Sequence, residues 1–329
     1  VISELLENIR SGIYRPCIVY RDDVPIAFSS YTLSMYEELT LVNFDDISDV
    51  LSLFYSQKDT YSRMQQKSTD LRKVLSSLVE RTSKKYDLQR KQLKDVEKRD
   101  KYRIYGELLQ AYGHEVKHGD KSITVNNYYD NTEITIPLDD MLSPVENANK
   151  YFNKYNKMKR TYEASLKLVK DSKETLDHLL LLQNSIEIAV SEADLLEIRE
   201  EMVLSGYLKG KKGRKESGKA EKSKPLHYIS SDGFHIYVGK NNLQNDRLTF
   251  KTAGPKDLWF HAKEMPGSHV IVRLEGKEDV PDATYEEAAR LAAYYSSGRT
   301  SPKVEIDYTR RGNLKKPPES NPGYVIYHT

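Results

Sequence analysis

The sequence predicts an α+β protein with three parts: a short N-terminal β segment, a long antiparallel coiled-coil stalk tipped by a small β unit, and a C-terminal α+β domain. Two long stretches carry apolar residues at three- and four-residue steps, the pattern of helices that pack along one face. A short segment with strand-like alternation separates them. The C-terminal part alternates like a series of strands around one alanine-rich helix, so it predicts a separate domain.

Residues 1–45 are expected to form a small β unit. The run CIVYRDDVPIAFSS has two apolar stretches on either side of Asp22 and Asp23, which is a hairpin signal. The chain begins with Val rather than Met, so we expect a piece of a longer protein.

The stalk is predicted over residues 46–208. From Asp46 to Ala111 there is no proline and only one glycine, Gly106, which predicts one long helix. The second arm follows Ser143 and repeats every seven residues, as the seam of a left-handed coiled coil does. The predicted seam positions are Val145, Ala148, Phe152, Tyr155, Lys159, Tyr162, Leu166, Val169, Lys173, Leu176, Leu180 and Gln183.

The tip is predicted over residues 112–142. Ile123 to Val125 and Ile134 to Ile136 alternate like strands around a polar turn. Helices joined by so short a segment must run antiparallel, which places this unit at the end of the stalk. The tip is acidic, so we expect it to meet protein or solvent rather than RNA.

Residues 209–225 have no large apolar side chain and predict a flexible basic linker, although a contact with backbone phosphate stays open. The domain at 226–329 then shows alternation at Phe234, Ile236 and Val238, and again at Leu248 and Phe250. Thr284 and Glu287 have the spacing of a capping box that opens the alanine-rich helix.

The amino-acid composition limits the class of protein that this chain can be. The chain has 51 Lys and Arg against 49 Asp and Glu, yet basic and acidic blocks alternate along it, so a polyanion would meet basic zones. The single cysteine, Cys17, excludes an internal disulfide framework, fits a reducing cytosol and removes the clusters of most structural zinc sites. No apolar run approaches the ~18 residues of a membrane span.

Motifs for catalysis are missing from the sequence. It has no phosphate-binding Walker loop, no dinucleotide fingerprint and no His-Glu-x-x-His run. Ser268 and His269 are neighbours on a strand and point to opposite faces, so they are a poor nucleophile and base. His114 and His118 have no third ligand nearby. We therefore expect a binding protein that is not an enzyme and has no cofactor or metal.

The most informative run is DLWFHAKEMPGSHVIVR, at 257–273. If Leu258 and Phe260 face the core, then Trp259, His261 and Lys263 share the other face. Such a face suits a ligand with flat rings and negative charge, as nucleic acid has. The alternative is that Trp259 covers a second small core, and the pattern alone leaves both possibilities open.

Two further segments border this face. One is the turn after Gly239, whose amides can reach bases or phosphates, and the other is YTRRGNLKK, which has four positive charges and no acid. The predicted RNA-binding residues are Lys240, Asn241, Asn242, Lys251, Trp259, His261, Lys263, His269, Arg273, Arg310, Arg311, Lys315 and Lys316.

Several of these motifs also carry a resemblance. GKNNLQNDRLTFKTA, DLWFHAKEMPGSHVIVR, EEAARLAAYYS and KPPESNPGYVIY resemble the NFACT-R domain of the NFACT family. GELL, SPVENANKYFNKYNK and EIREEMVLSGYL extend the resemblance upstream. The family comprises ribosome-associated quality-control proteins, whose bacterial members have been called fibronectin-binding protein A. Residues 1–45 would then be the tail of an NFACT-N domain.

The resemblance implies a function. The protein would bind the large ribosomal subunit that is obstructed by peptidyl-tRNA, and would recruit alanyl-tRNA so that an untemplated alanine tail marks the nascent chain for degradation. Peptide transfer would be the chemistry of the ribosome, and the protein would be cytoplasmic. The Asp-Arg pair that the family uses for tRNA recruitment lies in a part of NFACT-N that this chain lacks.

Two rival functions stay open at this stage. One is a surface adhesin that binds fibronectin, although the sequence has no export signal. The other is a general coiled-coil scaffold, which leaves the face of Trp259, His261 and Lys263 unexplained.

Overall fold

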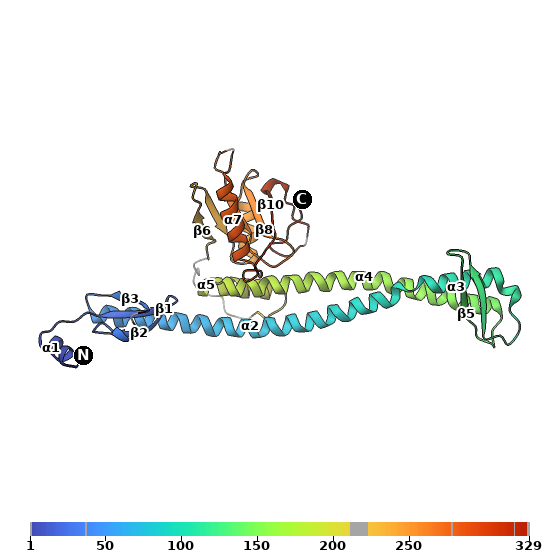
Figure 1. Ribbon diagram of the computed structural model, residues 1–329, viewed down its shortest axis with the longest axis horizontal. Coiled ribbons are helices and arrows are strands. Elements are labelled where there is room, and N and C mark those ends of the chain that lie inside the picture. Colours follow the sequence, from blue (N-terminus) through green and yellow to red (C-terminus); the bar gives the residue numbers. More distant parts are fainter. Residues whose placement is uncertain (1, 37, 211–222, 278, 319, 328–329) are drawn as a thin grey trace. The chain divides into compact units, whose positions relative to one another are not determined.

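The structure, a computed structural model, describes the chain apart from residues 1, 37, 211–222, 278, 319 and 328–329 (Figure 1). Most of the predicted linker therefore lies outside the described residues. The chain divides into two compact units, one of Val1–Leu75 with Leu181–Thr329 and the other of Ser76–Leu180. Helices and small sheets are both present, which confirms the predicted α+β class. No described helix is long and apolar enough to cross a membrane.

The N-terminal β unit is a three-stranded antiparallel sheet in the order β2-β1-β3. Its elements are α1 (Ile2–Arg10), β1 (Cys17–Arg21), β2 (Val24–Ser29), the 3₁₀ turn η1 (Ser34–Tyr36) and β3 (Thr40–Asn43). The hairpin predicted around Asp22 and Asp23 is confirmed, and both residues take the positive φ of a tight turn, 49° and 63°. Ile18 packs against Val50 and Phe54, so the sheet is anchored on the first turns of the following helix.

The unit Ser76–Leu180 holds two helical arms that run side by side in opposite directions (Figure 1). Its elements are the end of α2 (Ile47–Glu97), α3 (Asp100–Tyr112), η2 (Gly113–Glu115), β4 (Ser122–Asn127), β5 (Thr132–Pro137) and the start of α4 (Pro144–Ile188). The first arm is not one helix, because Lys98 and Arg99 interrupt it. The Arg99 guanidinium lies 3.9 Å from the ring centroid of Tyr162 on the other arm, a cation–π contact.

From Lys159 to Lys173 the coiled-coil seam of α4 is shifted by one residue at every second predicted position, whereas Phe152 faces the other arm as predicted. Ala148 is buried as predicted, but Leu166 is 44% exposed and Ser165 beside it is 8% exposed. Ser172 takes the next buried position and donates a hydrogen bond of 2.6 Å to Gln89 Oε1 of α2. A seven-residue repeat can step by three and then four residues, or by four and then three. Leu166 is larger and more apolar than Ser165, so the sequence favoured the order that the structure does not have. The helices instead approach each other over small side chains.

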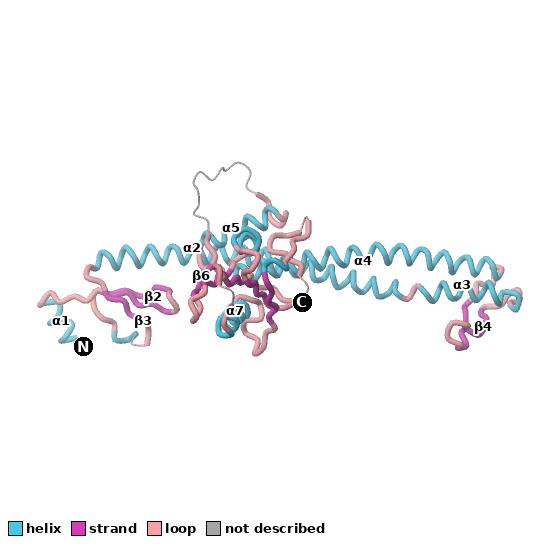
Figure 2. The backbone as a smooth tube through the Cα atoms, turned by 90° about the horizontal axis from the view of Figure 1, so that it is seen from above, coloured by secondary structure: helices cyan, strands magenta, loops and turns pink. Residues whose placement is uncertain are grey.

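The tip forms the hairpin that the alternation predicts, with Ile123 opposite Ile136 and Val125 opposite Ile134 (Figure 2). Its apolar face packs against α3 and the first turns of α4. The single glycine of the first arm has a steric reason here. A Cβ on Gly106 would lie 2.7 Å from the nearest ring carbon of Phe152, so a larger residue would push the two arms apart.

The C-terminal domain is a five-stranded antiparallel sheet in the order β10-β8-β9-β7-β6, with β6 and β10 at opposite edges (Figure 1). Its strands are β6 (Leu226–Ile229), β7 (His235–Val238), β8 (Leu258–Ala262), β9 (Val270–Arg273) and β10 (Ile306–Arg310). Its helices are α6 (Asn242–Arg247), the π-helical turn η3 (Leu248–Thr252), α7 (Asp282–Tyr294) and the turn η4 (Arg311–Asn313), while α5 (Glu192–Leu204) precedes the domain. One face of the sheet packs against α7 and forms the main core.

Two local expectations are wrong. Leu248 and Phe250 do not lie on a strand but on η3, where Leu248 is buried against the second face of the sheet. Thr284 does not cap α7, which already begins at Asp282. Its hydroxyl instead donates to Ser230 Oγ at 2.9 Å and ties the helix to the turn between β6 and β7. Local patterns cannot show such tertiary partners.

Candidate functional site

The predicted ligand face of β8 is covered by a second core. Leu258 and Phe260 belong to the main core under α7, so the predicted alternation along β8 is correct. Trp259, however, is 0% exposed and packs with Leu248, Ile271 and other apolar residues contributed by η3 and the C-terminal segment. The prediction that Trp259 offers a stacking surface to a ligand is therefore wrong. The alternative of a second small core, which the sequence left open, is the one observed.

His261, which is half-buried, and His269, which is buried, both pack against the Trp259 indole. The His261 ring stacks on Trp259 at a centroid distance of 5.6 Å, and His269 meets the indole edge-on at 5.3 Å. His269 Nδ1 lies 2.7 Å from Thr249 Oγ1. Burial lowers the pKa of His261 and brings that of His269 well below 6.5, because the interior disfavours the charged form. Because burial disfavours the charged form of both rings, neither is a good source of positive charge for a phosphate.

Lys240, Asn241 and Asn242 are also buried, at 6%, 1% and 1% exposed, and do not lie on an open loop. All three contact carboxylates of α5, which the sequence did not indicate as a neighbour. Lys240 Nζ lies 2.7 Å from Asp194 Oδ1. The Asn241 and Asn242 amides donate to Glu197 Oε2 at 2.9 Å and to Glu201 Oε1 at 2.8 Å. We call this set of contacts, with Gln244 and Arg247, the α5 dock.

The α5 dock is a built polar interface. Gln244 Nε2 donates to Glu197 Oε2 at 3.0 Å, and Arg247 lies 3.3 Å from the other oxygen of the same carboxylate. Burial alone would raise the pKa of Asp194, but hydrogen bonds from Lys240 and Ser223 outweigh it and hold that pKa below its usual value. The three predicted site residues are thus engaged within the protein.

Other predicted cations have acidic partners. Arg273 Nε lies 2.9 Å from Asp257 Oδ2, and Lys316 pairs with Asp246. Lys263 is 3.7 Å from Glu305 in a pair that stays exposed. Partly neutralised cations contribute less to the attraction of a polyanion than free ones.

A smaller group of cations remains open at one end of the sheet. Lys251 lies in the last turn of η3, Lys256 precedes β8 and Arg311 follows β10; the two lysines are exposed and Arg311 is half-buried. The Arg311 N–H donates to Asp257 O at 2.8 Å, and its guanidinium donates to Thr249 O at 2.8 Å. That guanidinium also lies 5.4 Å from the Phe250 ring centroid.

We call Lys251, Lys256, Arg311 and Phe250 the basic rim. Among the residues that the structure describes, no ion pair joins its two lysines to an acid. Sequence inspection identified Lys251 and Arg311 but missed Lys256 and Phe250, because only the hydrogen bonds between residues 255–257 and 311–312 bring them together. Exposed cations beside an aromatic ring suit the phosphates and bases of a nucleic acid.

The last two predicted residues lie outside the basic rim. Arg310 is exposed at the end of β10, and its charge acts on Tyr285 of α7, which lies on the opposite face of the sheet. Lys315 is exposed, and its backbone N–H donates to Ile326 O at 2.9 Å. Arg310 and Arg311 therefore serve different faces although they are neighbours.

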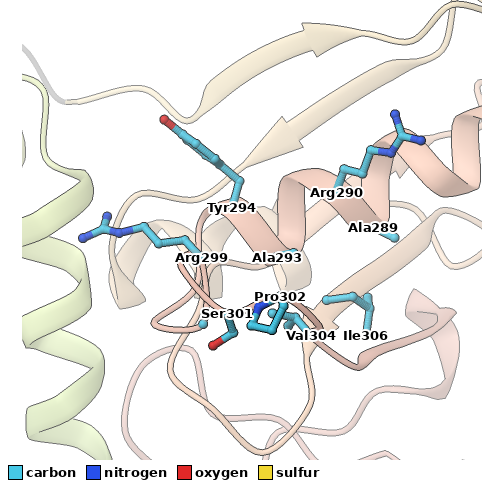
Figure 3. A pocket seen from close by; sticks show the side chains of 10 residues that line it. Ala289, Arg290, Ala293, Tyr294, Arg299, Ser301, Pro302, Val304 and Ile306 are labelled. Carbon is cyan, nitrogen blue, oxygen red and sulfur yellow. The ribbon is translucent and has the colours of Figure 1, made fainter.

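A pocket of about 400 Å³ beside α7 is a weaker candidate (Figure 3). Its floor is apolar, and the guanidinium groups of Arg290 and Arg299 point in opposite directions rather than toward a common point. Both are paired, with Glu286 and Glu187 respectively. The described residues also include no cluster of three His, Cys, Asp or Glu that could hold a metal ion.

Two family models match the chain. Residues 1–221 match the family described as NFACT N-terminal and middle domains, and residues 224–328 match the NFACT protein RNA binding domain. A protein named Rqc2 homolog RqcH from Streptococcus pneumoniae is 35% identical over 335 residues, which cover 99% of this chain and 58% of that protein. The protein of the same name from Bacillus subtilis is 37% identical over 290 residues, 86% of this chain and 50% of that protein.

A solved structure is also similar. It is that of the C-terminal of the fibronectin/fibrinogen-binding protein from Streptococcus suis, with 34% identity and a TM-score of 0.61. The match covers 82% of this chain and 92% of that one. The chain spans only 50% to 58% of the length of the two curated relatives.

Proposed function

Since the chain belongs to the NFACT family, we propose that it is the RNA-binding part of a ribosome-associated quality-control protein. The observation that carries this is the alignment with a protein named Rqc2 homolog RqcH over 99% of the chain. The match of the C-terminal domain to the NFACT protein RNA binding domain supports RNA as the ligand.

The finer proposal follows the family. In the whole protein, this part binds the large ribosomal subunit that carries an obstructing peptidyl-tRNA. The whole protein recruits alanyl-tRNA there, and the stalled chain receives an alanine tail. The protein acts in the cytoplasm as a binding factor and not as an enzyme, because peptide transfer belongs to the ribosome. By this proposal the present chain alone binds RNA but does not support tailing.

The basic rim gives the proposal a physical site. Lys251, Lys256 and Arg311 contact phosphate oxygens, and each contact releases a counterion from the nucleic acid. Such binding is strong at low salt and weakens steeply as salt rises. The buried cation Lys240 takes no part, since its ammonium is held by Asp194.

The test measures binding of the chain to a labelled single-stranded RNA between about 50 and 200 mM salt. The double variant Lys251→Ala with Lys256→Ala should make the negative slope of log affinity against log salt shallower by about 1.4, at about 0.7 per lost contact. Lys303→Ala is the matched control, because Lys303 is exposed near the opposite end of β10. An affinity that does not change with salt would refute the proposal, and equal losses in both variants would refute the rim.

A second candidate function is fibronectin binding. The observation in its favour is the name of the solved relative from Streptococcus suis. Cell fractionation of the full-length protein, together with ribosome co-sedimentation, separates the two candidates. Co-sedimentation with the large subunit supports quality control, whereas recovery at the cell surface without ribosomes supports the adhesin.

A further inference from the structure

Three nearly parallel aromatic rings lie on β6 and β7, the two strands of the sheet farthest from β10. His227 lies on β6, and His235 and Tyr237 lie on β7. The His227 ring is nearly parallel to that of His235, at a centroid distance of 5.0 Å and an angle of 22°, and to that of Tyr237, at 4.7 Å and 15°. His227 Nε2 and His235 Nδ1 are 2.8 Å apart, which locks the two imidazoles together. We call these three residues the ring platform.

The ring platform is not part of either core. The alternate residues of the same strands, such as Ile236 and Val238, face α7 in the main core. On the platform side, Tyr237 packs against the edge of the second core, but His227 remains exposed and the neighbouring Ile229 is 63% exposed. Of the three rings, only that of His227 lies on the edge strand β6.

The ring platform and the basic rim lie on one face of the sheet. His235 is opposite Arg273 in the sheet register, and Arg273 pairs with Asp257, whose carbonyl accepts from the Arg311 N–H. These residues form a row across four neighbouring chain segments. At about 4.8 Å per strand, the row spans roughly 14 Å. Tyr237 of the platform and Phe250 of the rim also pack against the same second core.

We propose that the ring platform binds unpaired bases of an RNA single strand whose phosphates contact the basic rim. This rests on the proposed RNA-binding function and names the form of RNA that the domain takes. A base offers a flat face to His227, and a stack needs no hydrogen bonds to base edges, so binding tolerates many sequences. In a duplex, each base is already stacked on both sides and cannot use the platform. Single-stranded loops and ends are therefore the preferred ligands.

The other occupants fit less well. A metal ion needs more ligands than the two imidazoles supply, and the described residues contain no cluster of three suitable side chains. A protein partner would favour an apolar surface, yet the rings adjoin a row of charged residues that leads to unpaired lysines.

The test uses the full chain and three labelled probes of equal length: a single-stranded RNA, the same strand with abasic positions, and an RNA duplex. His227→Leu keeps much of the side-chain volume but loses the aromatic plane, and His227→Tyr restores a ring. We expect His227→Leu to weaken single-strand binding by about tenfold, within the range that one base–aromatic stack contributes. The abasic strand and the duplex should show little change, and His227→Tyr should bind like the original chain.

Equal weakening for all three probes, or failure of His227→Tyr to restore binding, would overturn the ring platform. A second measurement needs no substitution: the ring proton resonances of His227 and His235 should move upfield when the single strand binds, because a stacked base shields them. Binding without such shifts would also overturn it. If the original chain binds no RNA at any salt, the proposed function itself fails. If binding depends on Lys251 and Lys256 but not on His227, only the platform fails.

Discussion

Removal of the Lys240 ammonium tests whether the α5 dock is closed in solution. In Lys240→Met the apolar chain of the lysine is largely kept, while Asp194 loses the cation 2.7 Å from its Oδ1. The two side chains are only 7% and 0% exposed, so water cannot replace the lost partner. Breaking a buried pair by removing one partner costs about 3–5 kcal/mol.

The lower end of that range applies here. Asp194 Oδ2 still accepts from the backbone N–H groups of Val190 and Ser191, both at 2.9 Å, because it forms the capping box of α5. We therefore expect a loss of about 3 kcal/mol in the free energy of unfolding. Adding Asp194→Asn removes the stranded charge, so the double variant should be at least about 1 kcal/mol more stable than the sum of the single effects.

Urea unfolding followed by the fluorescence of Trp259, the only tryptophan, measures these changes. Lys263→Met is the control, because its pair with Glu305 is exposed and longer, at 3.7 Å; its effect should stay within about 0.5 kcal/mol. If Lys240→Met also stays within about 0.5 kcal/mol of the original chain, the dock does not hold in solution and the argument is refuted.

Three further predictions concern the cores and the stalk. Trp259→Ala should lower the free energy of unfolding by about 3–5 kcal/mol in urea titrations, because it empties a fully buried site. A loss below about 1 kcal/mol would contradict the burial of Trp259. Leu166→Asp should leave the melting temperature of the stalk nearly unchanged, whereas Ser165→Asp, at a buried seam position, should lower it clearly, and the reverse order would restore the predicted seam. Burial holds the pKa of His269 well below 6.5, so below about pH 6.5 the unfolded chain takes up a proton that the folded chain does not. The free energy of unfolding should therefore fall as pH decreases through 6. Urea titrations at several pH values should show a flatter dependence in His269→Gln.

The repeating parts of the fold could be predicted because their patterns are local. The hairpin at Asp22 and Asp23, the tip hairpin and the alternation of Leu258, Trp259 and Phe260 were all predicted correctly. Alternation reports which side chains share a face of a strand, and this depends only on the backbone.

What covers that face depends on the rest of the chain. Trp259 was assigned to a ligand because η3 and the C-terminal segment carry no pattern that shows where they fold back. Lys240 looked available because its partner, Asp194, lies on a different element of the chain. The basic rim was only half found for the same reason, since Lys256 and Arg311 meet through backbone hydrogen bonds between distant segments.

The α5 dock holds α5 and the C-terminal domain together without relying on the covalent connection between them. Residues 205–225 connect α5 to β6 along the chain, but the contacts of Lys240, Asn241 and Asn242 hold α5 and the C-terminal domain together. The dock therefore governs how long the two partners remain together, independently of the covalent connection. A chain cut between these partners would behave as a complemented pair of fragments, and its assembly would then depend on dilution.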